Sequence, residues 1–197
     1  MSLYDELRQK HGSFIYHSYD FSEQDGSTLL TFHFSMDEYH FYPQWTFPEE
    51  FSRLEFDHAL ADRIAFSLGM AELVSYWKCA CPPTVEVRCG GLSAWEKNWW
   101  KKLYFNGLGE FFYRNGITPD LGTFMTINAP EEQPLSAQNN ALTGTLVPIG
   151  GGKDSVVTLE LLKKAGVDIS AYIINPRGAT LGCASAAGIP DNRIIGP

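Results

Sequence analysis

The chain has 197 residues, 44% of them hydrophobic, which is enough for one large domain or two small ones with a true hydrophobic core. Its formal net charge of -8 at pH 7 disfavours a nucleic-acid-binding surface, because such a surface needs a basic face that neutralises phosphates. No stretch approaches the roughly 18 consecutive apolar residues of a membrane span, and four cysteines are too few for a disulfide framework, so we expect a soluble cytoplasmic protein.

The first half of the chain has the pattern of an α+β domain. Residues 14–21 and 28–36 are rich in aromatic and β-branched side chains, and Asp25 and Gly26 stand between them. Such runs favour strands, and an Asp-Gly pair favours a tight turn with positive φ angles. The pattern therefore predicts a β-hairpin near the start of the chain.

One long helix is predicted from Phe56 to about Cys79. Apolar residues recur there at near-helical spacing, and Pro82 and Pro83 end the pattern because proline disrupts helical geometry. Residues 84–89 then alternate between polar and apolar side chains, which is typical of a strand.

A second helix is expected to begin at Ser93, because Glu96 completes a capping-box pattern, and to end at Gly116. Its aromatic side chains are expected to lie in the core rather than to form a stacking platform. They are Trp95, Trp99, Trp100, Phe105, Phe111 and Phe112. Glu110 and Arg114 are polar residues four apart among these aromatics, and they indicate either an ordinary surface ion pair or part of a pocket.

The polar, proline-containing stretch 128–144 is predicted to be a linker between two domains. The domain before it, residues 1–127, is interpreted as an α+β substrate or accessory domain. Beyond the linker, residues 145–197 alternate between strand and helix patterns, which predicts a doubly wound parallel sheet and places the chain in the α/β class. The expected strands are 145–149, 168–175 and 193–195, and the expected helices are 155–166 and 179–188.

The chain ends where the third strand of this second domain begins. We therefore expect the second domain to be truncated and the chain to be the N-terminal part of a longer protein.

Three glycines, Gly150 to Gly152, join the first strand of the second domain to its helix. In parallel sheets ligands bind beyond the carboxyl ends of the strands, and a helix N-terminus presents unpaired N–H groups to an anion. A Walker A loop would require glycine at Val147 and Ser or Thr at Asp154, and a dinucleotide fingerprint would require glycine at Ser155. Both of these loops are excluded, and a different phosphate-binding loop is indicated.

The stretch resembles the PP-loop, SGGxDS, of the N-type ATP pyrophosphatases, whose domain has the adenine nucleotide α-hydrolase-like fold. Gly151, Gly152, Asp154 and Ser155 match the motif, whereas Gly150 replaces its usual serine and removes one hydroxyl donor. The resemblance implies that the loop holds the diphosphate part of ATP and that the products are AMP and diphosphate.

The resemblance also implies roles for the polar residues beside the glycine loop and after the second strand. Lys153 would add positive charge, and the Ser155 hydroxyl would bind a phosphate oxygen. Asp154 would either bind Mg²⁺ or cap the helix. Arg177, which follows the second strand, would be either a phosphate or carboxylate partner or an ordinary surface arginine.

Three segments in the same order, 74–83, 103–117 and 146–162, resemble the bacterial UDP-N-acetylmuramoyl-L-alanyl-L-glutamate epimerases. The resemblance implies an enzyme that uses ATP and Mg²⁺ to invert the terminal L-glutamate of a UDP-N-acetylmuramoyl-dipeptide during peptidoglycan synthesis for the cell wall. An acyl adenylate removes the negative charge beside the α-carbon and makes that carbon a stronger acid, so pyridoxal phosphate is not needed.

Inversion requires a base and an acid on opposite faces of the α-carbon. The candidates are Glu72, Tyr76, Lys78, Cys79, Cys81, Glu110, Tyr113 and Arg114, and we select Glu110 and Arg114, with Lys153 and Asp154 of the loop, as catalytic residues. Cys79 and Cys81 are expected to be buried, inert thiols. The five histidines show no spacing typical of a metal site.

Two alternative functions stay open at this point. The first is another PP-loop enzyme, such as an amide-forming ligase or a tRNA-modifying enzyme, although the acidic charge disfavours the latter. The second is a nucleotide-binding module without turnover. The oligomeric state is not indicated by the sequence.

Overall fold

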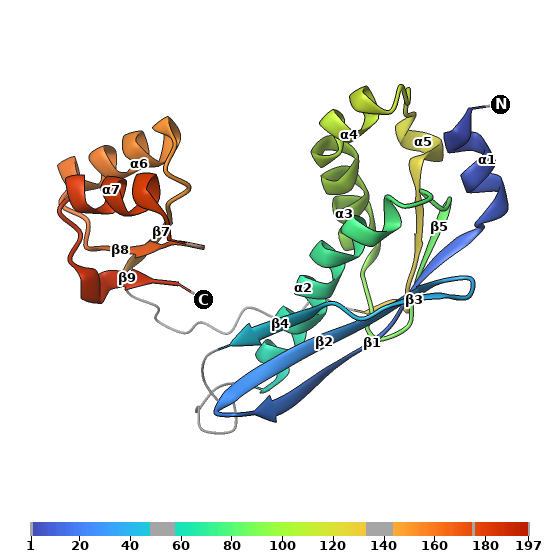
Figure 1. Ribbon diagram of the computed structural model, residues 1–197, viewed down its shortest axis with the longest axis horizontal. Coiled ribbons are helices and arrows are strands. Elements are labelled where there is room, and N and C mark those ends of the chain that lie inside the picture. Colours follow the sequence, from blue (N-terminus) through green and yellow to red (C-terminus); the bar gives the residue numbers. More distant parts are fainter. Residues whose placement is uncertain (1, 48–57, 133–143, 175, 197) are drawn as a thin grey trace. The chain divides into compact units, whose positions relative to one another are not determined.

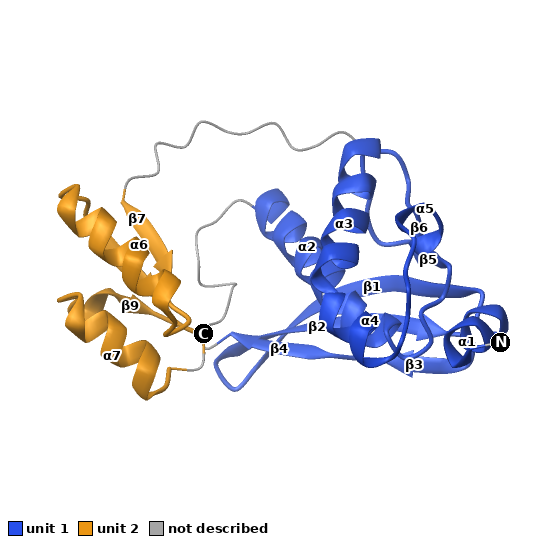
Figure 2. Ribbon diagram, turned by 90° about the horizontal axis from the view of Figure 1, so that it is seen from above, with its two compact units in different colours: residues 1–136 blue, residues 137–197 orange. Residues whose placement is uncertain are grey.

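A computed structural model describes residues 2–47, 58–132, 144–174 and 176–196 (Figure 1). The chain forms two compact units, Met1–Ser136 and Ala137–Pro197, which are coloured separately in Figure 2. Each unit has its own hydrophobic core. Most of the predicted linker 128–144 lies outside the described residues, because the described ranges omit 133–143.

Unit 1 begins with helix α1 (Leu3–Lys10), which the sequence patterns did not indicate, and continues into a hairpin. Strand β1 (Ser13–Gln24) pairs antiparallel with β2 (Ser27–Met36), so that Gln24 faces Ser27 across a two-residue turn. Asp25 and Gly26 both adopt positive φ angles, 52° and 79°, as a tight hairpin turn of this type requires. The predicted hairpin is therefore confirmed.

The sheet of unit 1 combines antiparallel and parallel pairing. Strands β3 (Tyr39–Phe41) and β4 (Gln44–Phe47) add to β2 in antiparallel fashion, whereas β5 (Thr84–Val87) lies parallel to β1, and β6 (Thr126–Asn128) parallel to β5. The order is β3-β2-β1-β5-β6, with β4 beside β2. The predicted strand at 84–89 is confirmed, and the parallel half makes the unit a mixed α/β structure.

Helix α2 (His58–Trp77) lies along one face of this sheet (Figure 1). Its buried side chains pack against Tyr16, Phe32 and Phe34 of the hairpin, and Tyr16 and Phe66 stack with ring centroids 5.9 Å apart. The described part of the predicted long helix is confirmed. The helix ends at Trp77, and Cys81 adopts a positive φ of 52° just before the two prolines.

The second predicted helix is divided into α3 (Ala94–Gly107) and α4 (Gly109–Arg114), followed by the short α5 (Leu121–Phe124). The capping box is confirmed, since the Ser93 hydroxyl accepts from the Glu96 N–H and the Glu96 carboxylate accepts from Ser93. The expectation of one continuous helix up to Gly116 is wrong. Leu108 leaves the helical region with ψ of 15°, and the glycines on each side, which are poor helix formers, explain the break.

Unit 2 is a layer of two helices on a three-stranded parallel sheet. The strands are β7 (Thr145–Pro148), β8 (Ile169–Tyr172) and β9 (Ile194–Ile195), in the order β7-β8-β9, and the helices are α6 (Lys153–Lys164) and α7 (Gly178–Ala186). A 3-10 turn, η2 (Asp191–Arg193), precedes β9. The predicted alternation of strands and helices is confirmed. No helix within the described ranges is long and apolar enough to cross a bilayer.

Candidate functional site

The glycine loop of unit 2 lies where the carboxyl ends of β7 and β8 meet. Gly151 has a φ of +79°, which favours glycine. A β-carbon at this position would also stand 3.1 Å from the Thr180 amide nitrogen, in the first turn of α7. The loop after β7 is therefore packed closely against the helix start after β8, and this packing leaves no room for a side chain at residue 151.

Helix α6 directs free backbone donors toward this edge. Its N-cap is Gly152, and Val156 makes the first bond of the helix, from its N–H to the Gly152 carbonyl oxygen at 3.4 Å. The N–H groups of Lys153, Asp154 and Ser155 precede that bond and have no acceptor within the helix. Together with the positive end of the helix dipole, they suit a phosphate or carboxylate group.

Two side chains of the loop have distinct environments. The Ser155 hydroxyl accepts a hydrogen bond from the Gly150 N–H at 3.1 Å, so the loop is closed upon itself. Asp154 is exposed, and it does not cap the helix, because residue 152 holds that position and no side chain caps it. A carboxylate that is exposed at the first turn, beside free N–H donors, fits the binding of Mg²⁺ with a nucleotide phosphate.

Arg177 lies at the same edge, at the start of α7. Its N–H donates to the Thr180 hydroxyl at 2.9 Å, and that hydroxyl donates to the Arg177 carbonyl oxygen at 2.8 Å. Its side chain is exposed. The structure thus brings Gly150 to Ser155 and Arg177 to one edge of unit 2, whereas Glu110 and Arg114 belong to unit 1.

A groove of about 600 Å³ in unit 1 contains Glu110 and Arg114. Its other lining residues are Lys78, Gly107, Leu108, Phe111 and Asn115. Glu110 Oε1 lies 3.3 Å from Arg114 Nη1, and the two side chains are 81% and 73% exposed. Glu110 and Arg114 therefore form an exposed ion pair and also line the groove.

A smaller pocket of about 160 Å³ shares Lys78, Phe111 and Asn115 with this groove and continues to Cys79 and Cys81. Cys81 is buried, and burial raises the pKa of its thiol to about 12, as expected for an inert thiol. Cys79 is exposed, so the expectation that it is buried is wrong. The helix ends at Trp77, and this places residue 79 in the turn that follows, where solvent reaches the thiol.

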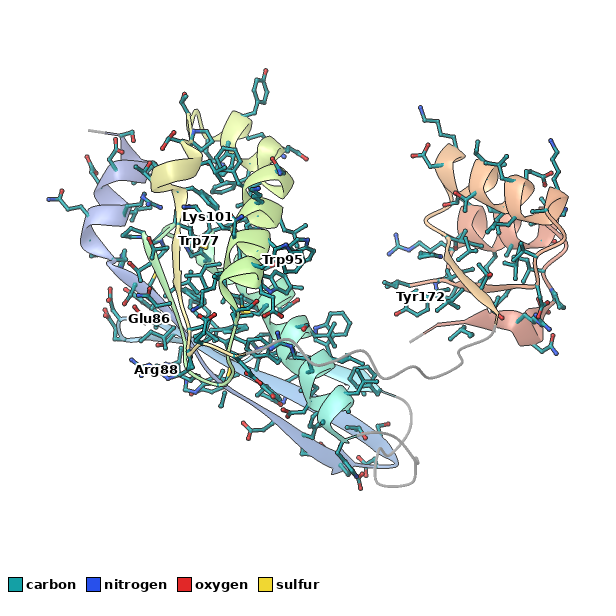
Figure 3. All side chains as sticks on the ribbon, turned by 180° about the vertical axis from the view of Figure 1, so that it is seen from behind. Trp77, Glu86, Arg88, Trp95, Lys101 and Tyr172 are labelled. Carbon is teal, nitrogen blue, oxygen red and sulfur yellow. The ribbon has the colours of Figure 1, made fainter. Side chains whose placement is uncertain are left out.

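The aromatic residues of α3 and α4 divide into core and surface. Trp100 and Phe112 are buried, and Phe105 and Phe111 pack against the core. Trp95 and Trp99, however, are 68% and 43% exposed, so the expectation that they are core residues is wrong. They lie four residues apart on the outer side of α3, where Figure 3 shows Trp95, whereas Trp77 lies in the core.

Three histidines that are far apart in the sequence meet on the sheet of unit 1. His33 Nε2 lies 2.9 Å from His40 Nδ1, and the rings of His17 and His33 stack at 4.4 Å. Burial and the neighbouring histidines lower the pKa of His17 and His33. Over the ranges that the structure describes, no group of three or more His, Cys, Asp or Glu residues is arranged to hold a metal ion.

Comparison with known proteins identifies the family to which the chain belongs. The profile of the family described as "MurL N-terminal domain" matches residues 5–195, nearly the whole chain. The chain belongs to the MurL N-terminal domain family. The resemblance that the three sequence segments indicated is thereby confirmed.

Relatives of this MurL-family chain carry one name, UDP-N-acetyl-alpha-D-muramoyl-L-alanyl-L-glutamate epimerase. The protein of Xanthomonas oryzae pv. oryzae is 38% identical over 124 residues, which cover 59% of this chain and 26% of the relative. Proteins of Micromonospora sp. and Salinispora tropica are each 30% identical, over 66% and 67% of this chain and 29% of their own lengths. The MurL-family chain thus spans less than a third of the relatives' length, and no solved structure matches it.

Proposed function

We propose that the protein is an ATP-dependent epimerase that inverts the terminal L-glutamate of UDP-N-acetylmuramoyl-L-alanyl-L-glutamate. The observation that carries this proposal is membership of the MurL N-terminal domain family, together with the shared name of three relatives. The reaction would belong to the synthesis of peptidoglycan precursors. The enzyme would accordingly be an isomerase that works on a soluble nucleotide-linked peptide.

The glycine loop is the proposed nucleotide site, and unit 2 the beginning of a PP-loop domain. The free N–H groups at the start of α6 would bind the diphosphate part of ATP, with Lys153 and Arg177 as cationic neighbours. Asp154 would hold Mg²⁺, and the Ser155 hydroxyl would exchange its bond with Gly150 for a phosphate oxygen. The packing of Gly151 against α7 supports this role, because it brings two helix starts to one edge.

ATP would supply the activation of the glutamate carboxyl group as an acyl adenylate, with release of diphosphate. A carboxylate beside the α-carbon opposes the formation of a carbanion, and its neutralisation makes proton removal feasible. Hydrolysis of the adenylate would then release AMP and the epimerised product.

The groove of unit 1 is the proposed binding site for the anionic substrate. Lys78 and Arg114 offer two cations to a diphosphate or carboxylate, and Phe111 adds an apolar surface to the same groove. Glu110 already pairs with Arg114, so it would orient that side chain or exchange with a substrate carboxylate. In this proposal Glu110 and Arg114 act on the substrate, while Lys153 and Asp154 act on the nucleotide.

The decisive experiment incubates the intact protein with UDP-N-acetylmuramoyl-L-Ala-L-Glu, ATP and Mg²⁺. Nucleotides are separated by chromatography, and the glutamate released by acid hydrolysis is analysed for chirality. Formation of AMP together with D-glutamate is expected. Formation of ADP, or AMP without inversion of glutamate, would reject the epimerase and favour a ligase or another PP-loop enzyme.

A further inference from the structure

A third cavity in unit 1 lies beyond the carboxyl ends of the parallel strands β5 and β6. It has a volume of about 160 Å³ and is lined by side chains from four parts of the unit. They include Tyr19 of β1, Asp62 and Phe66 of α2, Cys89 after β5, and Glu132 after β6. Because ligands of parallel sheets bind at this end of the strands, the position favours a functional site.

The buried hydroxyl of Tyr16 lies beside Cys89, one of the residues that line this pocket. Tyr16 is fully buried, and its hydroxyl makes no hydrogen bond of normal geometry with any residue that the structure describes. Gly69 of helix α2 lies against this hydroxyl, and a β-carbon at Gly69 would lie 2.0 Å from the Tyr16 hydroxyl oxygen. A buried donor without a well-formed hydrogen bond is destabilising, so a stronger acceptor beside the Tyr16 hydroxyl would stabilise the site.

The thiol of Cys89 is the group that can become this acceptor. Burial raises the pKa of Cys89 to about 12, so the thiol is protonated at neutral pH, and the neighbouring Tyr16 hydroxyl acts in the opposite direction on that pKa. A thiolate accepts a hydrogen bond far better than a thiol does. Loss of the Cys89 proton would therefore strengthen the hydrogen bond that the Tyr16 hydroxyl donates to this sulfur.

Asp62 lies in the same pocket as a potential base. The Tyr19 hydroxyl donates a hydrogen bond to its carboxylate, and burial and that bond raise the pKa of Tyr19, which keeps the phenol protonated. Arg63, which also lines the pocket, pairs with Glu96 and donates to the Gly91 carbonyl oxygen at 2.9 Å. Asp62 thus accepts from a neutral donor that lines the same pocket.

We propose that this pocket is the proton-transfer site of the epimerase, with Cys89 as the acid and Asp62 as the base. The inference rests on the proposed function. The Asp62 carboxylate takes the proton from the glutamyl α-carbon, and the electron pair of that C–H bond passes into the activated carboxyl group. The Cys89 S–H bond then breaks as its proton is added to the other face of the α-carbon.

The thiolate that remains accepts a hydrogen bond from Tyr16, and it regains a proton from water, while Asp62 returns its proton to water. Tyr16 is therefore a positioning residue, which acts through Cys89. Since the pocket is small, only the α-carbon region of the glutamyl group would enter it, and the rest of the substrate would lie outside.

The first test uses Cys89→Ser and Asp62→Asn in D₂O, with AMP release, glutamate chirality and deuterium at the α-carbon as readouts. Cys89→Ser should slow inversion about 100-fold or more but still release AMP, and it should place deuterium in L-glutamate, because the base still works. Asp62→Asn should abolish both inversion and deuterium exchange. Asp62 is exposed, so this variant should fold even if Cys89→Ser does not.

The outcomes separate the two proposals. If the wild-type protein inverts glutamate but either variant stays within about threefold of it, the pocket is not the proton-transfer site and the proposed function stands. If the wild-type protein neither releases AMP nor inverts glutamate, the proposed function falls, and this inference falls with it. Cys183→Ala, in unit 2, is the matched thiol control and should leave inversion unchanged.

The second test uses Tyr16→Phe, which removes only the buried hydroxyl beside Cys89. We expect kcat for inversion to fall about tenfold with KM unchanged, because a hydrogen bond to a charged thiolate is lost. The variant should also slow alkylation of Cys89 by iodoacetamide, measured at this residue by mass spectrometry across alkaline pH. Unchanged kcat and an unchanged alkylation profile would show that the hydroxyl has no role beyond packing.

Discussion

Gly151 lies against the backbone of Thr180 so closely that a β-carbon at residue 151 would stand 3.1 Å from the Thr180 amide nitrogen. This contact joins the glycine loop after β7 to the first turn of α7, and the positive φ of Gly151 reinforces the need for glycine there. The contact leads directly to the first prediction.

Gly151→Ala should lower the stability of unit 2 by about 1–2 kcal/mol for the left-handed backbone alone, and it should weaken nucleotide binding because the loop must shift. Urea unfolding and the Kd for ATP check the two effects. Gly150→Ala is the matched control for unfolding, since a β-carbon there meets nothing within 4 Å. Equal unfolding midpoints for the two variants would contradict the packing argument.

Asp154→Asn should reduce Mg²⁺-dependent AMP release about 100-fold or more while leaving the fold intact, since the side chain is exposed and does not cap α6. Rates measured against Mg²⁺ concentration, with circular dichroism of the same samples, check this. Glu160→Gln, on the same helix, removes an exposed carboxylate that lies 3.6 Å from Lys163 and should have little effect on the rate. Normal AMP release by Asp154→Asn would remove this residue from the nucleotide site.

The variant Arg114→Gln tests whether Arg114 binds the substrate in the groove or only forms an exposed ion pair. Its ion pair with Glu110 is exposed, so the stability should change by less than about 0.5 kcal/mol, whereas KM for the UDP-linked substrate should rise about tenfold if Arg114 binds the anion. Lys102→Gln, on α3 and outside the groove lining, is the control. If KM stays at the wild-type value, Arg114 serves the surface ion pair alone.

Glu96 should make unit 1 sensitive to acid. Burial raises its pKa, but hydrogen bonds from Ser93 and the charge of Arg63 outweigh this and lower the pKa below its usual 4.5. A lowered pKa in the folded state stabilises the fold above about pH 4.5, and this stabilisation is lost as the pH falls through the folded-state pKa. The difference in unfolding free energy between wild type and Glu96→Gln should therefore be largest near neutral pH and shrink in acid, and a constant difference across pH would contradict this.

Local signals explain which parts of the fold the sequence could predict. The hairpin follows from Asp25 and Gly26, and the start of α3 follows from Ser93 and Glu96, because these residues act on backbone within three positions of themselves. The break at Leu108 was missed because the aromatic pattern continues through it, although two glycines flank it. Strand β6 has only three residues, so its pattern is too short to distinguish it from a loop.

The two candidate sites also differ in how far the sequence could predict them. The glycine loop is contiguous in sequence, so its residue types and spacing indicate an anion site directly. The pocket around Cys89 depends on Tyr19, Asp62 and Glu132, each of which is more than forty residues from the next along the chain. They meet only when β1, β5 and β6 pair and α2 packs on the sheet. The Cys-Gly-Gly run after β5 was its one local signal.

The parallel pairing of unit 1 also bears on how the protein is made on the ribosome. The hairpin of β1 and β2 needs only residues 13–36. The pairing of β1 with β5, however, requires residues from 84 onward, and the pairing of β5 with β6 requires residues from 126 onward. Partners that are distant in the chain make such pairing slow. The nascent chain therefore exposes the β1 edge of its hairpin until residue 87 has left the exit tunnel, and the edge of β5 until residue 128 has left it. Binding of a chaperone would protect the chain most in that interval.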